Sequence, residues 1–197
     1  MLDRIVLASA NPGKLRELAE LLAPLQVQVL AQSDLAISSV EETAASFVEN
    51  ALLKARHASL HSGLPALADD SGIVVDALQG APGLYSARYA GPAADDAANN
   101  SKLIAELQAH APPWVARYHA CIVLLRHPQD PCPLIAEADW EGQIQATPAG
   151  TGGFGYDPHF YIPSLGKTAA QLGAELKNSL SHRALALRAL LQRWPTS

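Results

Sequence analysis

The sequence predicts an α/β fold in which a mixed β-sheet is flanked by helices. Two observations support this class: strand patterns alternate with amphipathic helix patterns in the first half of the chain, and a hairpin pattern follows in the second half. The 197 residues suffice for one large domain or two small lobes with a sizeable core. Because no linker-like change of composition interrupts residues 1–197, we predict a single domain with two lobes.

In the first half, the strand candidates are short apolar runs, and the helix candidates carry apolar residues at spacings of three and four. In chain order these elements are a strand at 4–9, a helix at 15–25, a strand at 27–32, a helix at 46–60, and a strand, turn and strand within 65–78, with the turn at Asp70–Gly72. Asn11 is an N-cap candidate with Pro12 at the first helical position, and Ser46 and Glu49 have capping-box spacing.

The second half begins with a polar helix pattern at 93–110. Two strand patterns, at 115–127 and 132–144, flank the turn-forming residues PQDP and predict an antiparallel hairpin. The chain closes with two predicted helices, at 168–180 and 181–194.

The composition excludes several classes of function. A net charge of −5 gives no broad basic surface, so we expect no nucleic-acid polymer as a partner. The start MLDRIVLASANPGK has no signal-peptide pattern, and no apolar run approaches the roughly 20 residues that span a membrane, so we expect a cytoplasmic protein. Cys121 and Cys132 flank a predicted turn, where free thiols are favoured over a cross-strand disulfide.

The stretch SANPGK lies where a strand becomes a helix. The backbone amides and the dipole at a helix start favour an anion, and Lys14 adds a positive charge in the first turn. The spacing matches neither a Walker loop nor a dinucleotide fingerprint. An ordinary capped helix with a solvated lysine explains the same residues, so phosphate binding is one of two interpretations.

Two pairs of acids provide candidate metal ligands. Glu41 and Glu42 precede the second helix, and Asp69 and Asp70 lie at a predicted strand end. Adjacent strand residues point to opposite sides, so we expect one Asp of the pair to face any given cleft. A carboxylate from each segment, with waters and substrate phosphates, would suit Mg²⁺. Turn-forming acids at the ends of elements are the alternative interpretation.

Two further segments carry charge in informative places. On the second predicted helix, Asn50 and Lys54 share a face, which by itself indicates a solvated surface. His182 and Arg183 follow Ser181, a candidate cap, at the start of the last helix, where positive charge opposes the helix dipole unless an anion or acid compensates.

The stretch GTGGFGYDP, residues 150–158, spends four of nine positions on glycine and adds Phe154, Tyr156 and Asp157. Fixing glycine costs backbone entropy, so a dense cluster indicates that something approaches the chain closely. A tight connection between strands is the simpler alternative.

Taken in order, these segments resemble the inosine triphosphate pyrophosphatase family, which hydrolyses non-canonical purine nucleoside triphosphates. The resemblance runs through ASANPGKLREL, EETAASFVENALLKA, ADDSGIVVDAL, GAPGLYSARYAG, GTGGFGYDPHF and LKNSLSHRALAL, nearly the whole chain. The pairing of GTGGFGYDP with SHR at this separation is its most specific part. The resemblance implies a mixed α/β fold with two lobes around a central substrate cleft, and a homodimer.

The same resemblance assigns candidate site residues. Asp70 is the catalytic general base and a ligand of Mg²⁺, together with Glu41, for which the neighbouring Glu42 is the alternative register. The substrate-binding candidates are Ser9, Ala10, Asn11, Pro12, Gly13, Lys14, Lys54, Ser71, Phe154, Gly155, Tyr156, Asp157, Lys177, His182 and Arg183. Two departures from the family pattern, Ala10 and Ala184, affect loop geometry.

The resemblance implies hydrolysis of ITP, dITP and XTP to the nucleoside monophosphate and pyrophosphate. Phe154 would stack on the base, the glycines would let the backbone approach the purine, and the surrounding amides would read a 6-keto group, which reverses the donor and acceptor of adenine. A pyrophosphatase for modified pyrimidine nucleotides and a non-catalytic nucleotide sensor are the alternatives.

Overall fold

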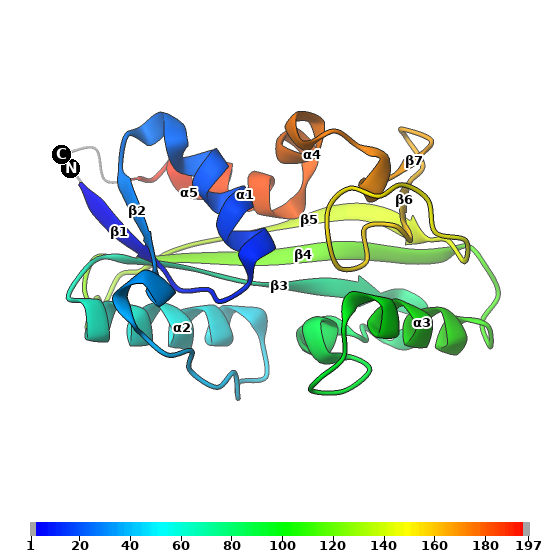
Figure 1. Ribbon diagram of the computed structural model, residues 1–197, viewed down its shortest axis with the longest axis horizontal. Helices are drawn as coiled ribbons and strands as arrows, with labels where there is room; N and C mark the ends of the chain where they lie inside the picture. Colours follow the sequence, from blue (N-terminus) through cyan, green and yellow to red (C-terminus); the bar gives the residue numbers. More distant parts are fainter. Residues whose placement is uncertain (1–2, 195–197) are drawn as a thin grey trace. The chain divides into compact units, whose positions relative to one another are not determined.

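The computed structural model describes residues 3–194 and contains a mixed β-sheet with helices, as the sequence predicts (Figure 1). The strands are β1 (Arg4–Leu7), β2 (Gln28–Ala31), β3 (Ala66–Val75), β4 (Trp114–Leu125), β5 (Leu134–Ile144), β6 (Phe160–Ile162) and β7 (Lys167–Thr168), in the sheet order β2-β1-β3-β4-β5-β6-β7. Strand β1 pairs in parallel with β2 and β3, whereas β6 pairs antiparallel with β5 and β7.

The α-helices of the described chain are α1 (Pro12–Leu22), α2 (Phe47–Ser62), α3 (Asp96–Leu107), α4 (Ala174–Leu180) and α5 (His182–Leu191). The two predicted helix caps, Asn11 and Ser46, are confirmed. Asn11 caps α1 by accepting from the backbone N–H of Lys14 at 3.0 Å, and the Ser46 hydroxyl accepts from the N–H of Glu49 at the start of α2. Each side chain satisfies a helical N–H that has no partner within its own helix.

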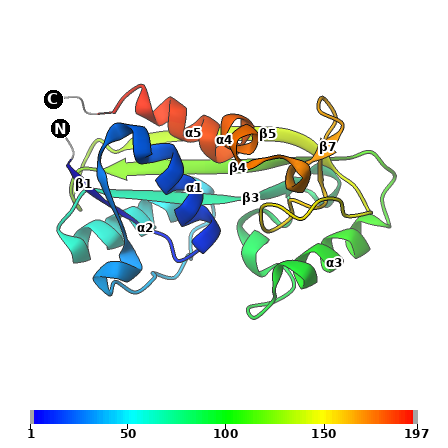
Figure 2. The same cartoon turned by 45° about the horizontal axis from the view of Figure 1, so that its top comes forward.

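The described chain divides into two compact units, and the fold of each follows from its own core. The first unit comprises residues 3–70, 120–138 and 183–194. Alternate residues of its strands face opposite sides: Ile5 and Leu7 pack in a cluster with α1 and α5, whereas Val6 and Ala8 pack in a cluster with α2. Figures 1 and 2 show α1 and α5 on one face of these strands and α2 on the other.

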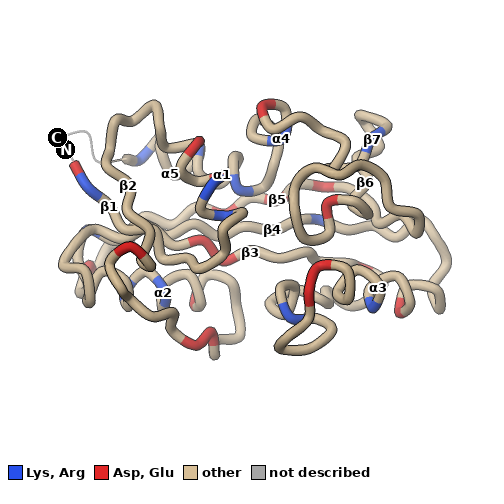
Figure 3. Tube along the Cα trace, in the orientation of Figure 1, with Lys and Arg blue, Asp and Glu red and all other residues tan. Residues whose placement is uncertain are grey.

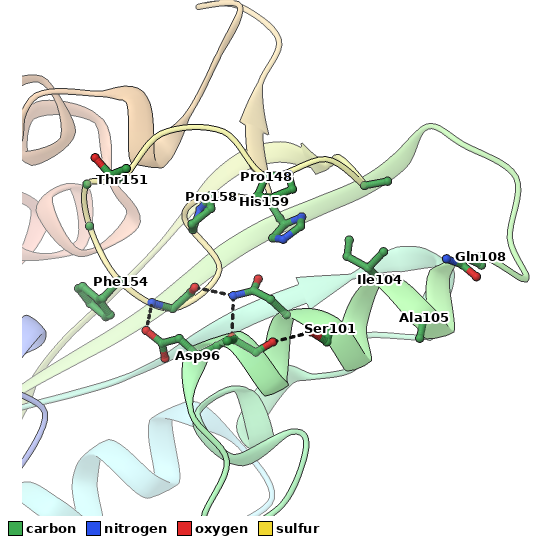
Figure 4. Close-up of a pocket in the computed structure, with 16 residues that line it drawn as sticks. Asp96, Ser101, Ile104, Ala105, Gln108, Pro148, Thr151, Phe154, Pro158 and His159 are labelled. Atoms are coloured by element: carbon green, nitrogen blue, oxygen red, sulfur yellow. Dashed lines mark hydrogen bonds between the residues drawn. The ribbon is translucent and has the colours of Figure 1, made fainter.

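The second unit comprises residues 71–119 and 139–182. Its core joins α3 to the strands through apolar and aromatic side chains, with Leu103 and Leu107 of α3 packed in one cluster with Ile73, Tyr118 and Phe160. This core places the start of α3 beside the segment that follows β5, where the glycine-rich stretch lies (Figure 4).

Two sequence-based expectations about elements are wrong. Residues 66–75 form one continuous strand, β3, rather than two strands with a turn at Asp70–Gly72. The acids there are buried and paired with cations, so they do not mark a turn. The segment 168–180 is only partly helical, because β7 and a short 3₁₀ turn (Ala169–Gln171) precede α4, which begins after Gly173.

The state of the cysteines and the character of the helices can be compared with the sequence-based expectations. Cys121 is buried and Cys132 is exposed, and both are free thiols. Among residues 3–194, every helix is too short or too polar to cross a membrane.

Candidate active site

The predicted site residues fall into both compact units, and each group is described within its own unit. The first unit holds Ser9, Ala10, Asn11, Pro12, Gly13, Lys14, Glu41, Lys54, Asp70 and Arg183, and the second holds Ser71, Phe154, Gly155, Tyr156, Asp157, Lys177 and His182.

The loop from Ser9 to Lys14 connects β1 to α1 in a preset conformation. The backbone N–H of Asn11 donates to the Ser9 hydroxyl at 3.2 Å, and the Asn11 side chain caps the helix. Pro12 occupies the first helical turn, where its missing N–H costs nothing. The loop therefore presents the positive end of α1 on a fixed backbone, the geometry that an anion site requires.

The side chain of Lys14, at the end of this loop, belongs to a buried ionic network. Its ammonium lies 2.9 Å from a carboxylate oxygen of Asp69, and the guanidinium of Arg183 contacts the same oxygen at 3.3 Å. Arg183 also pairs with Glu17 of α1 and is only 2% exposed. The family resemblance implies that Arg183 binds substrate, and no sequence pattern indicates Glu17. In the structure, Arg183 connects α5 to α1 and β3 within the first unit.

Asp69 and Asp70 point to opposite sides of β3, as the strand alternation predicts, and their environments differ. Burial disfavours a charged Asp69, but Arg183 and Lys14 outweigh that effect and hold its pKa far below the ordinary value. Burial raises the pKa of Asp70, and the nearby Lys54 offsets this only in part. Asp69 is thus a permanent anion, whereas Asp70 has a proton affinity above that of an ordinary aspartate.

Lys54 is the centre of a second charged cluster. Its ammonium lies 2.7 Å from Asp70, 2.6 Å from Glu42 and 2.9 Å from the backbone carbonyl of Asp69. Burial would lower the pKa of Lys54, but Asp70 and Glu42 outweigh burial and raise it. The interpretation of this helix face as solvated is therefore wrong: Asn50 is 2% exposed, and its side chain accepts from the backbone N–H of Ala44.

The structure distinguishes the two neighbouring glutamates. Glu42 is partly buried and contacts Lys54, which in turn contacts Asp70, whereas Glu41 is exposed. The geometry favours Glu42 over Glu41 as the carboxylate that acts with Asp70. The spacing of the sequence does not separate the two, because both lie in the irregular segment before α2.

In the second unit, the protein's own atoms fill the space beside several glycines of the 150–158 stretch. A Cβ on Gly153 would overlap the Asp157 carboxylate, and a Cβ on Gly150 or Gly152 would crowd the backbone of Ala170. Gly153 also has a φ of +74°, which disfavours other residues. The protein's own packing therefore explains the glycines at these three positions, and the approach of a purine to this stretch stays a prediction.

The Asp157 carboxylate accepts hydrogen bonds from three different groups of the second unit. One carboxylate oxygen accepts from the Tyr118 hydroxyl at 3.1 Å, and the other accepts from Lys177 at 2.6 Å and from the backbone N–H of Phe154 at 2.9 Å. Asp157 is 2% exposed, so these donors replace its solvation. Asp157 positions Phe154 and Lys177. No sequence pattern indicates a role for Tyr118, which lies in a strand pattern 39 positions before Asp157.

The aromatic side chains of the second unit have distinct roles. The Lys177 ammonium lies 4.9 Å from the centre of the half-buried Phe154 ring. His182 stacks on Tyr118, with centroids 4.8 Å apart and planes inclined by 9°. Tyr156, a substrate-binding candidate, is 4% exposed and donates its hydroxyl to the carbonyl of Ser86, so its side chain belongs to the core.

Acidic and basic positions are intermixed along both units rather than gathered on one element (Figure 3). Within the first unit, however, Lys14, Lys54, Asp69 and Asp70 come from α1, α2 and β3 to form two adjoining charged clusters. A carboxylate of raised pKa next to lysines and a helix N-terminus suits hydrolysis of a phosphorylated substrate.

Comparisons with known proteins agree with this chemistry. A dITP/XTP pyrophosphatase from Xanthomonas campestris pv. campestris is 59% identical over 190 residues, which are 96% of each chain. A protein of the same name from Nitrosomonas europaea is 56% identical over 191 residues, covering 97% of this chain and 94% of the relative.

Solved structures show the same fold. A HAM1 protein from Coxiella burnetii superposes with a TM-score of 0.90 at 47% identity, covering 98% of both chains. The Ham1 protein of Staphylococcus aureus gives a TM-score of 0.85 at 38% identity, covering 96% of this chain and 97% of that one. The model of the Ham1 family matches residues 5–193, and the chain therefore belongs to the Ham1 family.

Proposed function

We propose that this protein hydrolyses the non-canonical purine nucleotides ITP, dITP and XTP to the nucleoside monophosphate and pyrophosphate. The observation that carries the proposal is the buried charged cluster of the first unit, in which Asp70 contacts Lys54 at 2.7 Å, Glu42 contacts the same lysine at 2.6 Å, and Lys14 of α1 pairs with the neighbouring Asp69. The name dITP/XTP pyrophosphatase, carried by relatives more than half identical over nearly the whole chain, supports the substrate class.

In the proposed mechanism Asp70 accepts a proton from the attacking water. Its raised pKa suits this role, because a general base works best when its pKa approaches the working pH. Lys54, 2.7 Å from Asp70, orients the carboxylate and carries positive charge toward the phosphates. The loop from Ser9 to Lys14 would hold the triphosphate at the positive end of the α1 dipole, and Lys14 would stabilise the charge that develops on the leaving pyrophosphate.

The first unit fits Mg²⁺ as the cofactor. Carboxylate oxygens of Glu42 and Asp70 converge on a single cation, the Lys54 ammonium, at 2.6 and 2.7 Å. Within residues 3–194, no group of three or more His, Cys, Asp or Glu side chains is arranged to hold a metal. Two carboxylates together with substrate phosphates are the usual ligand set for this ion, which would neutralise phosphate charge when bound.

The metal assignment predicts different effects for the two neighbouring glutamates. Glu42→Gln should raise the Mg²⁺ concentration for half-maximal activity by about tenfold, the effect of losing a charged interaction of about 1.4 kcal/mol. Glu41→Gln, the matched control, should leave it unchanged. Titration of activity with MgCl₂ makes the measurement, and the reverse order of effects would restore Glu41 as the ligand.

For base recognition, Phe154 supplies a stacking surface. The expectation that the amides around Phe154 read the edge of the base needs correction, because the N–H groups of Phe154 and Gly155 already donate to Asp157 and Asp96. Selectivity for a 6-keto purine is therefore assigned to side chains, of which Lys177 and His182 are the candidates in the second unit.

We further propose, on the family resemblance alone, a homodimer in the cytoplasm that acts on the free nucleotide pool as a single domain. Size-exclusion chromatography with light scattering would test the dimer, and a mass equal to one chain would refute it.

A substrate panel tests the function. Release of pyrophosphate should be measured from ITP, dITP, XTP, ATP, GTP and a modified pyrimidine triphosphate, each with MgCl₂ and with EDTA. We expect kcat/KM for ITP and XTP to exceed that for ATP by more than about 100-fold, the discrimination expected when a mismatched base leaves buried polar groups unpaired. Preference for the pyrimidine would indicate the related house-cleaning class, and binding without release of pyrophosphate would indicate a sensor.

A further inference from the structure

The start of α3 holds one residue of the glycine-rich stretch, Gly155, through both of its backbone polar groups. The backbone N–H of Gly155 donates to the Asp96 carboxylate at 2.6 Å, and the backbone carbonyl of Gly155 accepts from the side-chain amide of Asn100 at 2.9 Å. Asp96 and Asn100 are four residues apart, so they share one face of the helix. Figure 4 shows these hydrogen bonds between helix and loop.

Gly155 immediately follows Phe154, whose own N–H is held by Asp157 at 2.9 Å. The two peptide N–H groups that flank the Phe154 α-carbon are therefore each fixed by a carboxylate, one from α3 and one from the loop itself. Hydrogen bonds to charged acceptors are about twice as strong as neutral ones. The orientation of the Phe154 ring thus depends on both carboxylates.

Gly155 itself contributes little packing. Gly155 has a φ of +63°, and a Cβ placed on it would meet no atom within 4 Å. A cavity of about 650 Å³ separates part of α3 from the loop, with Ile104 and Gln108 on the helix side and Thr151 on the loop side (Figure 4). Beside this cavity, the hydrogen bonds at Gly155 attach the loop to α3, in addition to the packing of Tyr156 in the core that it shares with α3.

The side chain of Asn100 supports the same role. It is 8% exposed, and its amide oxygen is buried with no hydrogen-bond partner among the described residues, although its nitrogen donates to Gly155 and to the Asp96 carbonyl. A buried unpaired acceptor costs about 1–3 kcal/mol, so stability alone does not explain an asparagine here.

We infer that Asp96 and Asn100 are positioning residues that set the Phe154 ring for stacking on the substrate base. This inference rests on the proposed function, because it concerns the purine site of that reaction. Asp96 and Asn100 act through Gly155, and neither needs to touch the substrate. Losing their hold lets the loop sample orientations in which Phe154 cannot stack, which weakens nucleotide binding more than the chemical step.

The test compares Asn100→Ala and Asp96→Ala with Ser101→Ala, a control on the same helix that lines the same cavity and bonds only within α3. We expect KM for ITP to rise about tenfold in the first two variants, the loss of one or two hydrogen bonds, with kcat changed by less than about twofold. Asp96→Asn retains an acceptor and should restore most of the affinity. Ser101→Ala should behave as wild type.

A double-mutant cycle separates positioning from a general structural effect. In the Phe154→Ala background, Asn100→Ala should raise KM by less than about twofold, because the ring through which it acts is gone. Full additivity of the two substitutions, or an unchanged KM in both Asn100→Ala and Asp96→Ala, would overturn the inference.

Calorimetric binding of ITP in the presence of EDTA distinguishes this inference from the proposed function. If the wild type binds ITP in this assay but releases no pyrophosphate from it once MgCl₂ is supplied, the proposed reaction is wrong, and weaker ITP binding by Asn100→Ala would still support positioning. If the wild type hydrolyses ITP and Asn100→Ala binds it equally well, the inference fails and the reaction stands. A wild type that neither binds nor hydrolyses ITP overturns both.

Discussion

Asp69 and Asp70 carry the same carboxylate on consecutive residues, and β3 turns them to opposite sides. Asp69 pairs with Lys14 and Arg183, which keep it ionised, whereas Asp70 pairs with Lys54 in a buried setting where burial outweighs the nearby lysines. A carboxylate held permanently ionised by two buried cations is suited to structure. A carboxylate with a raised pKa is suited to proton transfer.

The first prediction follows from this division. Asp70→Asn should lower kcat for ITP by at least about 100-fold, the contribution typical of a general base, while ITP still binds. Pyrophosphate release gives kcat, and calorimetry gives the affinity. Wild-type turnover in this variant would remove Asp70 from the mechanism.

Asp69→Asn provides the comparison. This substitution keeps the proposed general base, Asp70, but removes a buried counter-charge from Arg183 and Lys14. It should therefore lower the free energy of unfolding by about 3 kcal/mol, the range for breaking a buried ion pair. Urea unfolding measures this. A stability equal to wild type would show that the network is dispensable.

At the scale of elements, the glycine-rich stretch is built around contacts within the protein. Gly153 makes room for the Asp157 carboxylate, and Gly150 and Gly152 make room for the backbone at Ala170. The stretch therefore has a fixed shape before any ligand arrives. Pre-organisation of this kind lowers the entropy cost of binding, which a pliable segment would not do.

Two glycines of this stretch give a matched prediction. Gly153→Ala should destabilise the protein and abolish activity, because the new methyl group would overlap Asp157 and the residue has a φ of +74°. Gly155→Ala meets only the penalty of a φ of +63° in open space, about 1 kcal/mol. Thermal unfolding and kcat/KM for ITP rank the two variants, and equal effects would contradict the role given to Asp157.

The sequence predicts those features of the elements that local residues determine. Asn11 and Ser46 cap their helices as expected, because a cap involves residues only a few positions apart. The predicted turn at Asp70–Gly72 fails because the cations that allow acids inside β3 lie on α1, α2 and α5, far away in the chain. For the same reason, Tyr118 and Glu17 could not be identified before their partners were placed in space.

At the scale of the molecule, stability combines apolar clusters with buried charge. In the first unit, clusters on both faces of the strands surround an ionic network of Glu17, Asp69, Lys14 and Arg183. Apolar burial does not depend on pH, whereas the network does. Stability should therefore respond to acid in a way that can be traced to one residue.

Because the pKa of Asp69 is lowered in the folded protein, the free energy of unfolding should decrease as the pH falls. Above its ordinary pKa of 3.8 the carboxylate is ionised in both states, and its stabilising effect is complete. As the pH falls below 3.8, the unfolded chain takes up a proton that the folded chain refuses, so stability is lost.

We expect urea unfolding between pH 5 and about pH 2 to show a smaller loss of stability in Asp69→Asn than in the wild type, since the variant lacks this proton uptake. Asp70→Asn, whose raised pKa acts in the opposite direction, should retain the loss. Parallel curves for the wild type and Asp69→Asn would assign acid sensitivity to other groups.

Both lysines of the first unit, Lys14 and Lys54, are paired with carboxylates, and this pairing affects which anions can bind to the cluster. Lys14, Lys54 and Arg183 face four internal counter-ions, namely Glu17, Glu42, Asp69 and Asp70. The resting cluster therefore carries no surplus of positive charge, and an incoming polyanion must displace resident carboxylates in an ion exchange. A ligand with several negative charges can replace several of these carboxylates at once, whereas a singly charged anion can replace only one, so the cluster favours highly charged ligands.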